Sequence, residues 1–341
     1  MSVLKVNNRQ ELEMLNIVKL VASYMVVFIH VSFPGQFGID IVYLARFAVP
    51  FFFIVSGYFS YNSFNLKNIK KIDKKIQTTG LLYLESIGFY LVMILCVQRD
   101  FGKFNSWLRA GLSGTNFFEW ILWNKIPLIE LEHLWFIGAL LYCYIFMRII
   151  YKYPNLIKLL PFLLIVNYIL GEGGQLFNCT EIPEYITRNA WFCGIPCFAI
   201  GYLIRKHEST YVICFWNKLS TKTLFIVAML TEVLVLVEAH TVGMTDLYVF
   251  SLVAAVLLFL YGITYKNNLA QRWKKISEID TGIIYIIHQV VAIFLRIAIE
   301  KIHFKYGNMI LPILTCLIAT MISIGFKYVK KGVRKQIWKS I

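Results

Sequence analysis

Charged side chains are scarce in this sequence of 341 residues: Asp, Glu, Lys and Arg make up 16% of it, whereas hydrophobic residues make up 58%. A soluble domain needs a polar surface and carries about 25% charged residues. This shortage excludes an ordinary soluble fold. Several windows near 20 residues long are almost wholly apolar, which is long enough to cross a hydrocarbon core of roughly 30 Å as a helix. The composition therefore predicts an all-α, polytopic integral membrane protein.

Acidic residues are the scarcer of the two charge types, with 19 Asp and Glu against 34 Lys and Arg, for a net charge of +15. In a membrane protein the positive-inside rule explains such an excess, so no nucleic-acid partner is expected. The seven cysteines show no Cys-x-x-Cys or Cys/His metal spacing, and no metal site is predicted. The apolar run from Met14 lacks a small-residue cleavage site, so we interpret it as a retained span.

The apolar pattern predicts ten spans within a single membrane-embedded domain, residues 1–341, with no appended soluble domain. Their approximate bounds are 14–33, 41–60, 79–98, 133–151, 157–171, 189–205, 223–239, 246–265, 279–299 and 308–326. The fifth is short and contains Pro161, which membrane helices tolerate better than soluble ones. With a cytoplasmic N-terminus, the inner segments hold 24 Lys and Arg and the outer ones seven, which predicts that both termini are cytoplasmic.

The longest predicted non-spanning stretch, residues 99–132, is rich in Trp and Phe and falls outside. One interpretation is an aromatic belt that lies in the membrane interface. The other is a partly re-entrant lid that stacks on a sugar acceptor.

Two ionisable residues stand out in the first predicted span. Lys19 and His30 are eleven residues apart, which in a helix places both side chains on one face, with a rise of roughly 16 Å between them. Lys19 would lie in the inner leaflet and His30 towards the outer surface, with Ser23 between them on that face. The pattern suits a long ligand that enters from the cytoplasm. The alternative is a snorkelling lysine and a histidine satisfied by a neighbouring carbonyl.

Further polar residues accumulate in the other spans, and embedded ionisable groups are functional candidates by default. Arg46 begins the second span, where Ser56-Gly57 would let another helix approach closely. Glu85, in the third span, is predicted to lie at the depth of Lys19 and to be its partner. His133 opens the fourth span at the outer boundary.

The ninth span adds Asp280 at its inner end, with Tyr285 and His288 one turn apart near mid-membrane. Glu232 and Glu238, towards the outer end of the seventh span, could face an acceptor cavity, although nothing in the sequence orients their side chains.

The order of these segments resembles the acyltransferase-3 membrane family. The first span of that family carries an Arg, ten intervening residues and a His, a spacing matched by Lys19 and His30. Four later motifs match in order: "VPFFFIVSGYF" at 49–59, "HLWFIGALL" at 133–141, "GIPCFAIGYLIRK" at 194–206, and a Tyr-x-x-His at Tyr285 and His288. The resemblance runs from about Leu15 to Phe326, and five motifs in order are specific where one would not be.

The resemblance implies an O-acyltransferase that moves an acyl group from cytoplasmic acyl-CoA to a carbohydrate outside the membrane. The acyl group is usually acetyl, from acetyl-CoA, and succinyl is a variant. The acceptor would be a hydroxyl of a polysaccharide, lipid-linked glycan or peptidoglycan, and the expected location is a bacterial plasma membrane. Position 19 is usually Arg in the family, so Lys19 keeps the charge but loses the bidentate fork that suits phosphate.

The catalytic roles follow from this implied reaction. Attack of a hydroxyl on a thioester needs a general base, and His30 is the natural candidate, acting directly or after being acylated itself. Ser56, Tyr285 or His133 would stabilise the oxyanion.

The donor would be bound at the other end of the path. Lys19 would meet its phosphates, and Ser23, Glu85 and Arg46 complete the predicted donor-binding set.

Two other function classes remain open from the sequence. One is a transporter or exporter of a small molecule, such as an amino acid, or of a polysaccharide, without acyl-transfer chemistry. The other is a non-catalytic scaffold of an envelope complex. Loss of coenzyme A chemistry would abolish an enzyme's activity and leave transport intact.

Overall fold

The chain is a multi-pass membrane protein. A computed structural model describes residues 13–61, 69–98, 100–177, 182–207, 220–265 and 279–337, and within these ranges all regular structure is helical. Eight helical segments in the described part are long and apolar enough to cross a bilayer: Glu13–His30, Gly35–Ser60, Ile69–Gln98, Ile129–Ile150, Asn155–Leu176, Thr221–Val242, Thr281–Lys301 and Gly307–Val329. The expected all-α, polytopic class is confirmed.

The remaining two predicted spans are shorter than expected. Residues 246–265 correspond to the apolar helix α15 (Val249–Thr264), which has 16 residues. Residues 189–205 correspond to a π-helical turn, η8 (Ala190–Gly194), followed by the 12-residue helix α12 (Ile195–Lys206). The count of ten crossings and the cytoplasmic position of both termini therefore stay predictions.

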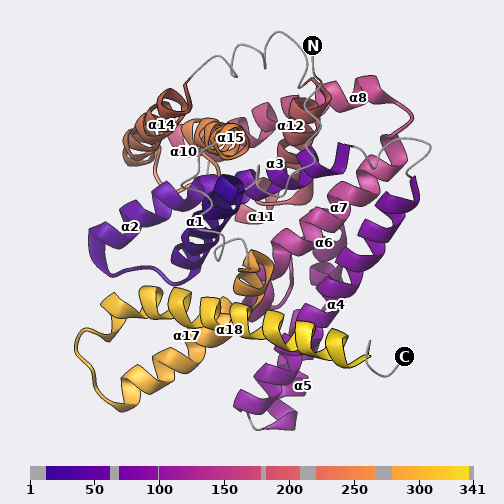
Figure 1. The fold of residues 1–341 in the computed structure, drawn as a ribbon. Helices are drawn as coiled ribbons and strands as arrows, with labels where there is room; N and C mark the ends of the chain where they lie inside the picture. The colour runs from indigo at the N-terminus through magenta and orange to yellow at the C-terminus, as the bar shows by residue number, and fades with distance from the viewer. Residues whose placement is uncertain are drawn as a thin grey trace. The chain divides into compact units, whose positions relative to one another are not determined.

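The chain divides into two compact units, and the first comprises residues 1–48, 217–236 and 253–341. It contains α1 (Glu13–His30), α2 (Gly35–Leu44), η2 (Ala45–Phe47), α17 (Thr281–Lys301) and α18 (Gly307–Ile337), with parts of α14 (Thr221–Val242) and α15. Figure 1 shows α17 and α18 side by side, joined by a short turn. Because α1 packs against both of them, its first-span side chains meet the ninth and tenth predicted spans.

A buried apolar cluster holds α1, α17 and α18 together. Val27 of α1, Ile284 of α17 and Ala319 of α18 are fully buried within it. Lipid chains are as apolar as these side chains, so close packing and interhelical hydrogen bonds stabilise the cluster more than the hydrophobic effect does. One such bond joins the hydroxyls of Tyr24 and Thr320 at 2.8 Å. Since Thr320 donates its own hydrogen to the Cys316 carbonyl, Tyr24 is the donor.

A glycine allows α15 to approach α1 in the same unit. A Cβ added to Gly262 would lie 3.0 Å from Leu15 Cδ1 and 3.1 Å from Leu15 Cα. Small residues at such crossings let helix backbones come close in membranes.

The second unit comprises residues 49–216 and 237–252. Its long helices are α3 (Ala48–Ser60, apart from Ala48), α4 (Ile69–Gln98), α7 (Trp135–Ile150) and α12. Figure 1 shows α4 running alongside α7. The shorter elements are α5 (Phe101–Gly111), α6 (Gly114–Trp123), η5 (Ile129–Leu134), α8 (Pro154–Leu159), η6 (Leu160–Phe162), α9 (Leu163–Tyr168), η7 (Ile169–Gly173), α10 (Gly174–Leu176) and α11 (Glu184–Thr187).

The close approach predicted at Ser56-Gly57 is confirmed. A Cβ on Gly57 would overlap the carbonyl of Phe198 on α12, and a Cβ on Gly201 of α12 would overlap the carbonyl of Ile54 on α3. The two glycines thus face opposite backbones where α3 and α12 cross, a geometry that no larger residue fits.

The fifth predicted span is interrupted at its proline. Pro161 lies in the 3₁₀ turn η6 between α8 and α9, where its missing N–H and fixed φ interrupt the α-helical ladder. A π-helical turn, η7, interrupts the same segment again before α10.

The predicted aromatic stretch contains two short helices, α5 (Phe101–Gly111) and α6 (Gly114–Trp123). Asp100 caps α5 by accepting the backbone N–H of Lys103 at 3.0 Å. Trp120 on α6 donates to the hydroxyl of Tyr83 on α4 at 2.9 Å, while Phe118 stays 65% exposed. The interfacial belt and the re-entrant lid both stay predictions for these helices.

Candidate functional site

Helix α1 carries Lys19 and His30 as the sequence predicts. The helix runs unbroken from Glu13 to His30, so an eleven-residue separation keeps both side chains on one face. His30 is its last residue and is half-buried. Beyond it the chain turns into α2 through Gly35, whose φ of +72° favours glycine. The turn leaves the imidazole at the helix end.

A second histidine lies beside His30. The ring centroids of His30 and His288 are 5.4 Å apart, with an angle of 37° between the ring planes. His288 belongs to α17 and is fully buried. Tyr285, one turn earlier, has its ring centroid 6.1 Å from that of His288. The packing of α1 on α17 thus joins two motifs that are 258 residues apart in the chain.

The hydrogen bonding of His288 determines its tautomer. Its Nδ1 lies 2.7 Å from the backbone oxygen of Tyr285. A carbonyl oxygen only accepts, so Nδ1 carries the hydrogen, and in the neutral ring Nε2 carries the lone pair. His288 is therefore an imidazole held in one tautomer, next to the candidate base.

The opposite end of this helix pair carries opposite charges. Asp280 precedes α17, where its side chain accepts the backbone N–H of Gly282 at 3.0 Å and caps the helix. The Asp280 carboxylate also exerts a Coulombic attraction on the half-buried ammonium of Lys19. Lys19 and Asp280 therefore place opposite charges at one end of α1 and α17, and His30 and His288 place two imidazoles together towards the other.

Ser23 and Arg46, both predicted to bind the donor, belong to the same unit. Ser23 lies between Lys19 and His30, but it is buried and donates its hydroxyl hydrogen to the Leu20 carbonyl at 2.7 Å. In this rotamer it offers a ligand lone pairs only. Arg46 lies in η2, which packs against α1.

Three predicted site residues belong to the second unit, and their roles stay predictions. Ser56 donates to the Phe52 carbonyl at 2.8 Å, so its hydroxyl would have to rotate to serve an oxyanion. His133 is buried against Tyr90, with ring centroids 4.7 Å apart. Glu85 is exposed on α4, and its predicted pairing with Lys19 is not tested; Asp280 is the carboxylate that acts on Lys19 within the first unit.

Sequence reasoning missed both pairings, although it singled out all four residues. In the predicted ten-span order, spans one and nine are both odd-numbered and would cross in the same direction, so ionisable groups at equal depth could have been matched. Asp280 and Lys19 both lie near the start of their spans, and His288 and His30 lie farther along. The similar predicted depth of Lys19 and Asp280, and of His30 and His288, could have indicated that these residues lie close together.

Comparison with known proteins confirms the family that these motifs resemble. The family model described as an acyltransferase domain matches residues 13–329, which include both pairs and every other predicted site residue. No curated protein and no solved structure matches the chain. In the part of the chain that the structure describes, no three His, Cys, Asp or Glu side chains gather as they would to hold a metal ion.

Proposed function

The chain belongs to the acyltransferase-3 family, and on that basis we propose that it is a membrane O-acyltransferase acting on cell-surface carbohydrates. It would move an acetyl or succinyl group from cytoplasmic acyl-CoA to a hydroxyl of a polysaccharide, lipid-linked glycan or peptidoglycan. The proposal rests on one observation. His30 shares a face of α1 with Lys19, and its ring lies beside that of His288 on α17.

Lys19 is the proposed contact for the phosphates of the donor. An ammonium has three hydrogen-bond donors, so attraction to Asp280 leaves it able to meet a phosphate as well. The Asp280 carboxylate is partly engaged in capping α17, which limits its competition with the donor. Binding at this end leaves the acyl thioester to extend along α1 towards His30.

His30 is the proposed general base. It takes the proton from the acceptor hydroxyl while that oxygen bonds to the thioester carbonyl carbon. The tetrahedral oxyanion then collapses, the carbon–sulfur bond breaks, and the coenzyme A thiolate takes the proton back from the imidazolium. His30 returns to its starting state, and the acyl group is an ester of the acceptor.

His288 is a proposed positioning residue in this step. Its ring lies against His30, and its tautomer presents a lone pair rather than a second N–H on the side opposite Tyr285. A neutral imidazole with that polarity stabilises the positive charge that His30 gains when it accepts a proton. His288 would thus act on the base His30 as the third group of a catalytic triad acts on its base.

The test is coenzyme A release by the purified, detergent-solubilised protein, given acetyl-CoA or succinyl-CoA with and without an envelope-glycan extract. Glycan-dependent release that falls by at least ~100-fold in His30→Ala supports the proposal. No release by folded wild-type protein with either donor would contradict it, and uptake into proteoliposomes would then test the transporter alternative.

A further inference from the structure

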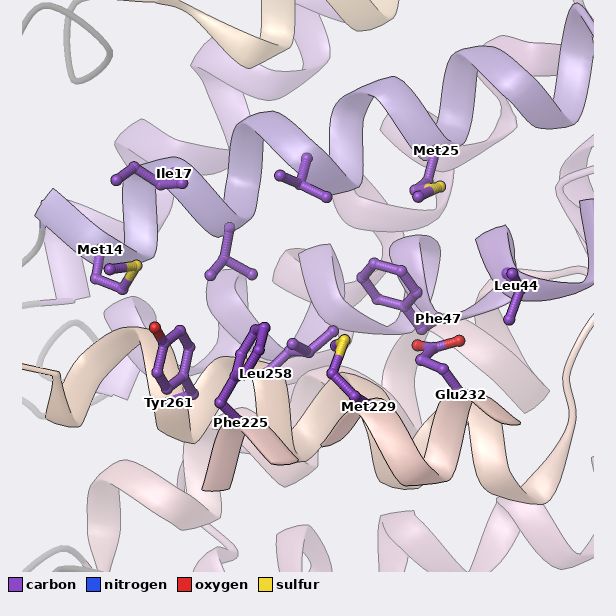
Figure 2. A pocket seen from close by; sticks show the side chains of 12 residues that line it. Met14, Ile17, Met25, Leu44, Phe47, Phe225, Met229, Glu232, Leu258 and Tyr261 are labelled. Carbon is purple, nitrogen blue, oxygen red and sulfur yellow. The ribbon is translucent and has the colours of Figure 1, made fainter. Parts of the chain in front are cut away.

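A cavity lies on the far side of α1 from the histidine pair. It has a volume of about 500 Å³, within the roughly 300–1,000 Å³ range of small-molecule pockets. Helices α1, α14 and α15 line it together with the end of α2 and η2, all within the first unit. Figure 2 shows the side chains of these helices converging on it.

The cavity is separate from the proposed acyl-transfer face. At 100° per residue, the lining residues Met14, Val21 and Met25 point about 140°, 160° and 120° away from Lys19, whereas His30 points about 20° away from it. Helix α1 itself therefore stands between the cavity and His30. A molecule bound in the cavity cannot present an acyl carbon to that histidine.

The cavity is elongated, apolar and open on one side. Met14 and Met25 lie at its two ends and are separated by roughly 16 Å along α1. Val21, Phe225 and Met229 line it and are 45%, 42% and 39% exposed. In a membrane protein such apolar exposure meets lipid chains, and methionine side chains adapt to flexible ones. The cavity is thus accessible from the bilayer and fits a single hydrocarbon chain.

One carboxyl group lies at the Met25 end of this apolar cavity. Glu232 lines it from α14, on the helix face shared by Phe225 and Met229, and Figure 2 shows its carboxyl beside Phe47. Both carboxyl oxygens are buried and find no hydrogen-bond partner among the described residues. Leaving a carboxyl unsatisfied in such surroundings is costly, so the cavity favours an occupant that donates a hydrogen bond to it.

We propose that this cavity binds a long-chain amphiphile whose polar end donates hydrogen bonds to Glu232, as an ammonium or a hydroxyl does. The chain lies along α1 towards Met14, and the polar end meets the carboxyl. A carboxylate-ended chain is disfavoured because it has no hydrogen to donate and would bring a charge into apolar surroundings. A purely apolar chain leaves Glu232 unsatisfied.

The experiment uses the full-length protein in phosphatidylcholine nanodiscs and a hexadecylamine probe that carries a photoreactive diazirine. Cross-links are mapped by peptide mass spectrometry. Labelling is expected on α1 between Met14 and Met25 and on α14. Unlabelled hexadecylamine and hexadecanol should compete for it, and hexadecanoate should compete at least ~fivefold less well. The relative potency of the amine and the alcohol identifies which donor the site prefers.

Two variants and a control make the test specific. Met229→Trp fills the cavity and should abolish labelling, whereas Leu230→Trp, at a 58% exposed position beside it and outside the lining, should not. Glu232→Leu keeps the apolar volume of the cavity and should remove the preference for chains that end in an ammonium or a hydroxyl. Each variant is compared by its gel-filtration profile in detergent, and Glu232→Leu decides the matter if Met229→Trp does not fold. Labelling that Met229→Trp leaves unchanged, equal competition by hexadecanoate, or cross-links elsewhere would overturn the proposal.

Discussion

At the residue scale, the two histidines have separable tasks. His30 handles the proton in the proposed reaction, and His288 holds a fixed tautomer against it. A positioning role predicts a loss in turnover without a loss in donor binding. A purely structural role for His288 predicts a loss of folded protein with normal turnover in what remains.

Replacing His288 should therefore lower kcat and leave the donor KM nearly unchanged. We expect His288→Phe to lower kcat by about 10- to 100-fold, less than the loss expected on removing the base itself. His288→Gln, which keeps a hydrogen-bonding group at this buried position, should recover part of the rate. Steady-state kinetics of both variants, normalised to folded protein, check this. Unchanged kcat in His288→Phe would exclude the positioning role.

Removing the charge of Lys19 and removing the charge of Asp280 should change the donor KM in opposite directions. Lys19→Ala should raise the donor KM by about 10- to 150-fold, the equivalent of one charge-assisted hydrogen bond, and Lys19→Arg should preserve or improve donor affinity. Asp280→Asn should lower the donor KM, because it removes the carboxylate that competes for Lys19 while asparagine still caps α17. Donor titrations at saturating acceptor measure all three. An unchanged KM in Lys19→Ala would mean that this lysine only snorkels.

At the scale of elements, the crossing of α3 and α12 depends on two glycines. Gly57→Ala should destabilise the protein strongly, since its Cβ would overlap the backbone of Phe198, which cannot rotate away. Overpacking of this kind costs about 1–3 kcal/mol or more. Gly88→Ala on α4 is the control, because a Cβ there meets nothing within 4 Å. The Tm in detergent should fall clearly for the first and hardly at all for the second; equal effects would contradict the crossing.

The sequence predicted the apolar elements better than their contacts. Residue spacing was sufficient to place Lys19 and His30 on one helix face, because this depends on local geometry alone. The interruption of the fifth span at Pro161 was not predicted, since membrane helices often tolerate proline. The approach of His288 to His30 depends on packing between helices 258 residues apart, which periodicity does not encode. The shortness of α12 was also missed, because the π-helical turn that precedes it leaves no mark in hydropathy.

At the scale of the whole molecule, the open question is which ends of the helices face the cytoplasm. The distribution of Lys and Arg predicts that the α17–α18 turn is outside and the start of α4 inside. In a background without native cysteines, Lys305→Cys should react with a membrane-impermeant maleimide in intact cells. Lys70→Cys should react only after permeabilisation. The reverse pattern would invert the topology and place the donor end of α1 on the wrong side for cytoplasmic acyl-CoA.

The distance along α1 between Lys19 and His30 sets the length of donor that can contact both residues. About 16 Å of helix separates Lys19 from His30, so only a donor that spans this length engages both ends at once. A truncated thioester that lacks the phosphates reaches the histidine without touching the lysine, and its turnover should be indifferent to Lys19→Ala. The protein would then select its acyl donor by the length of the molecule as well as by its charge, and the rigid helix α1 sets that length.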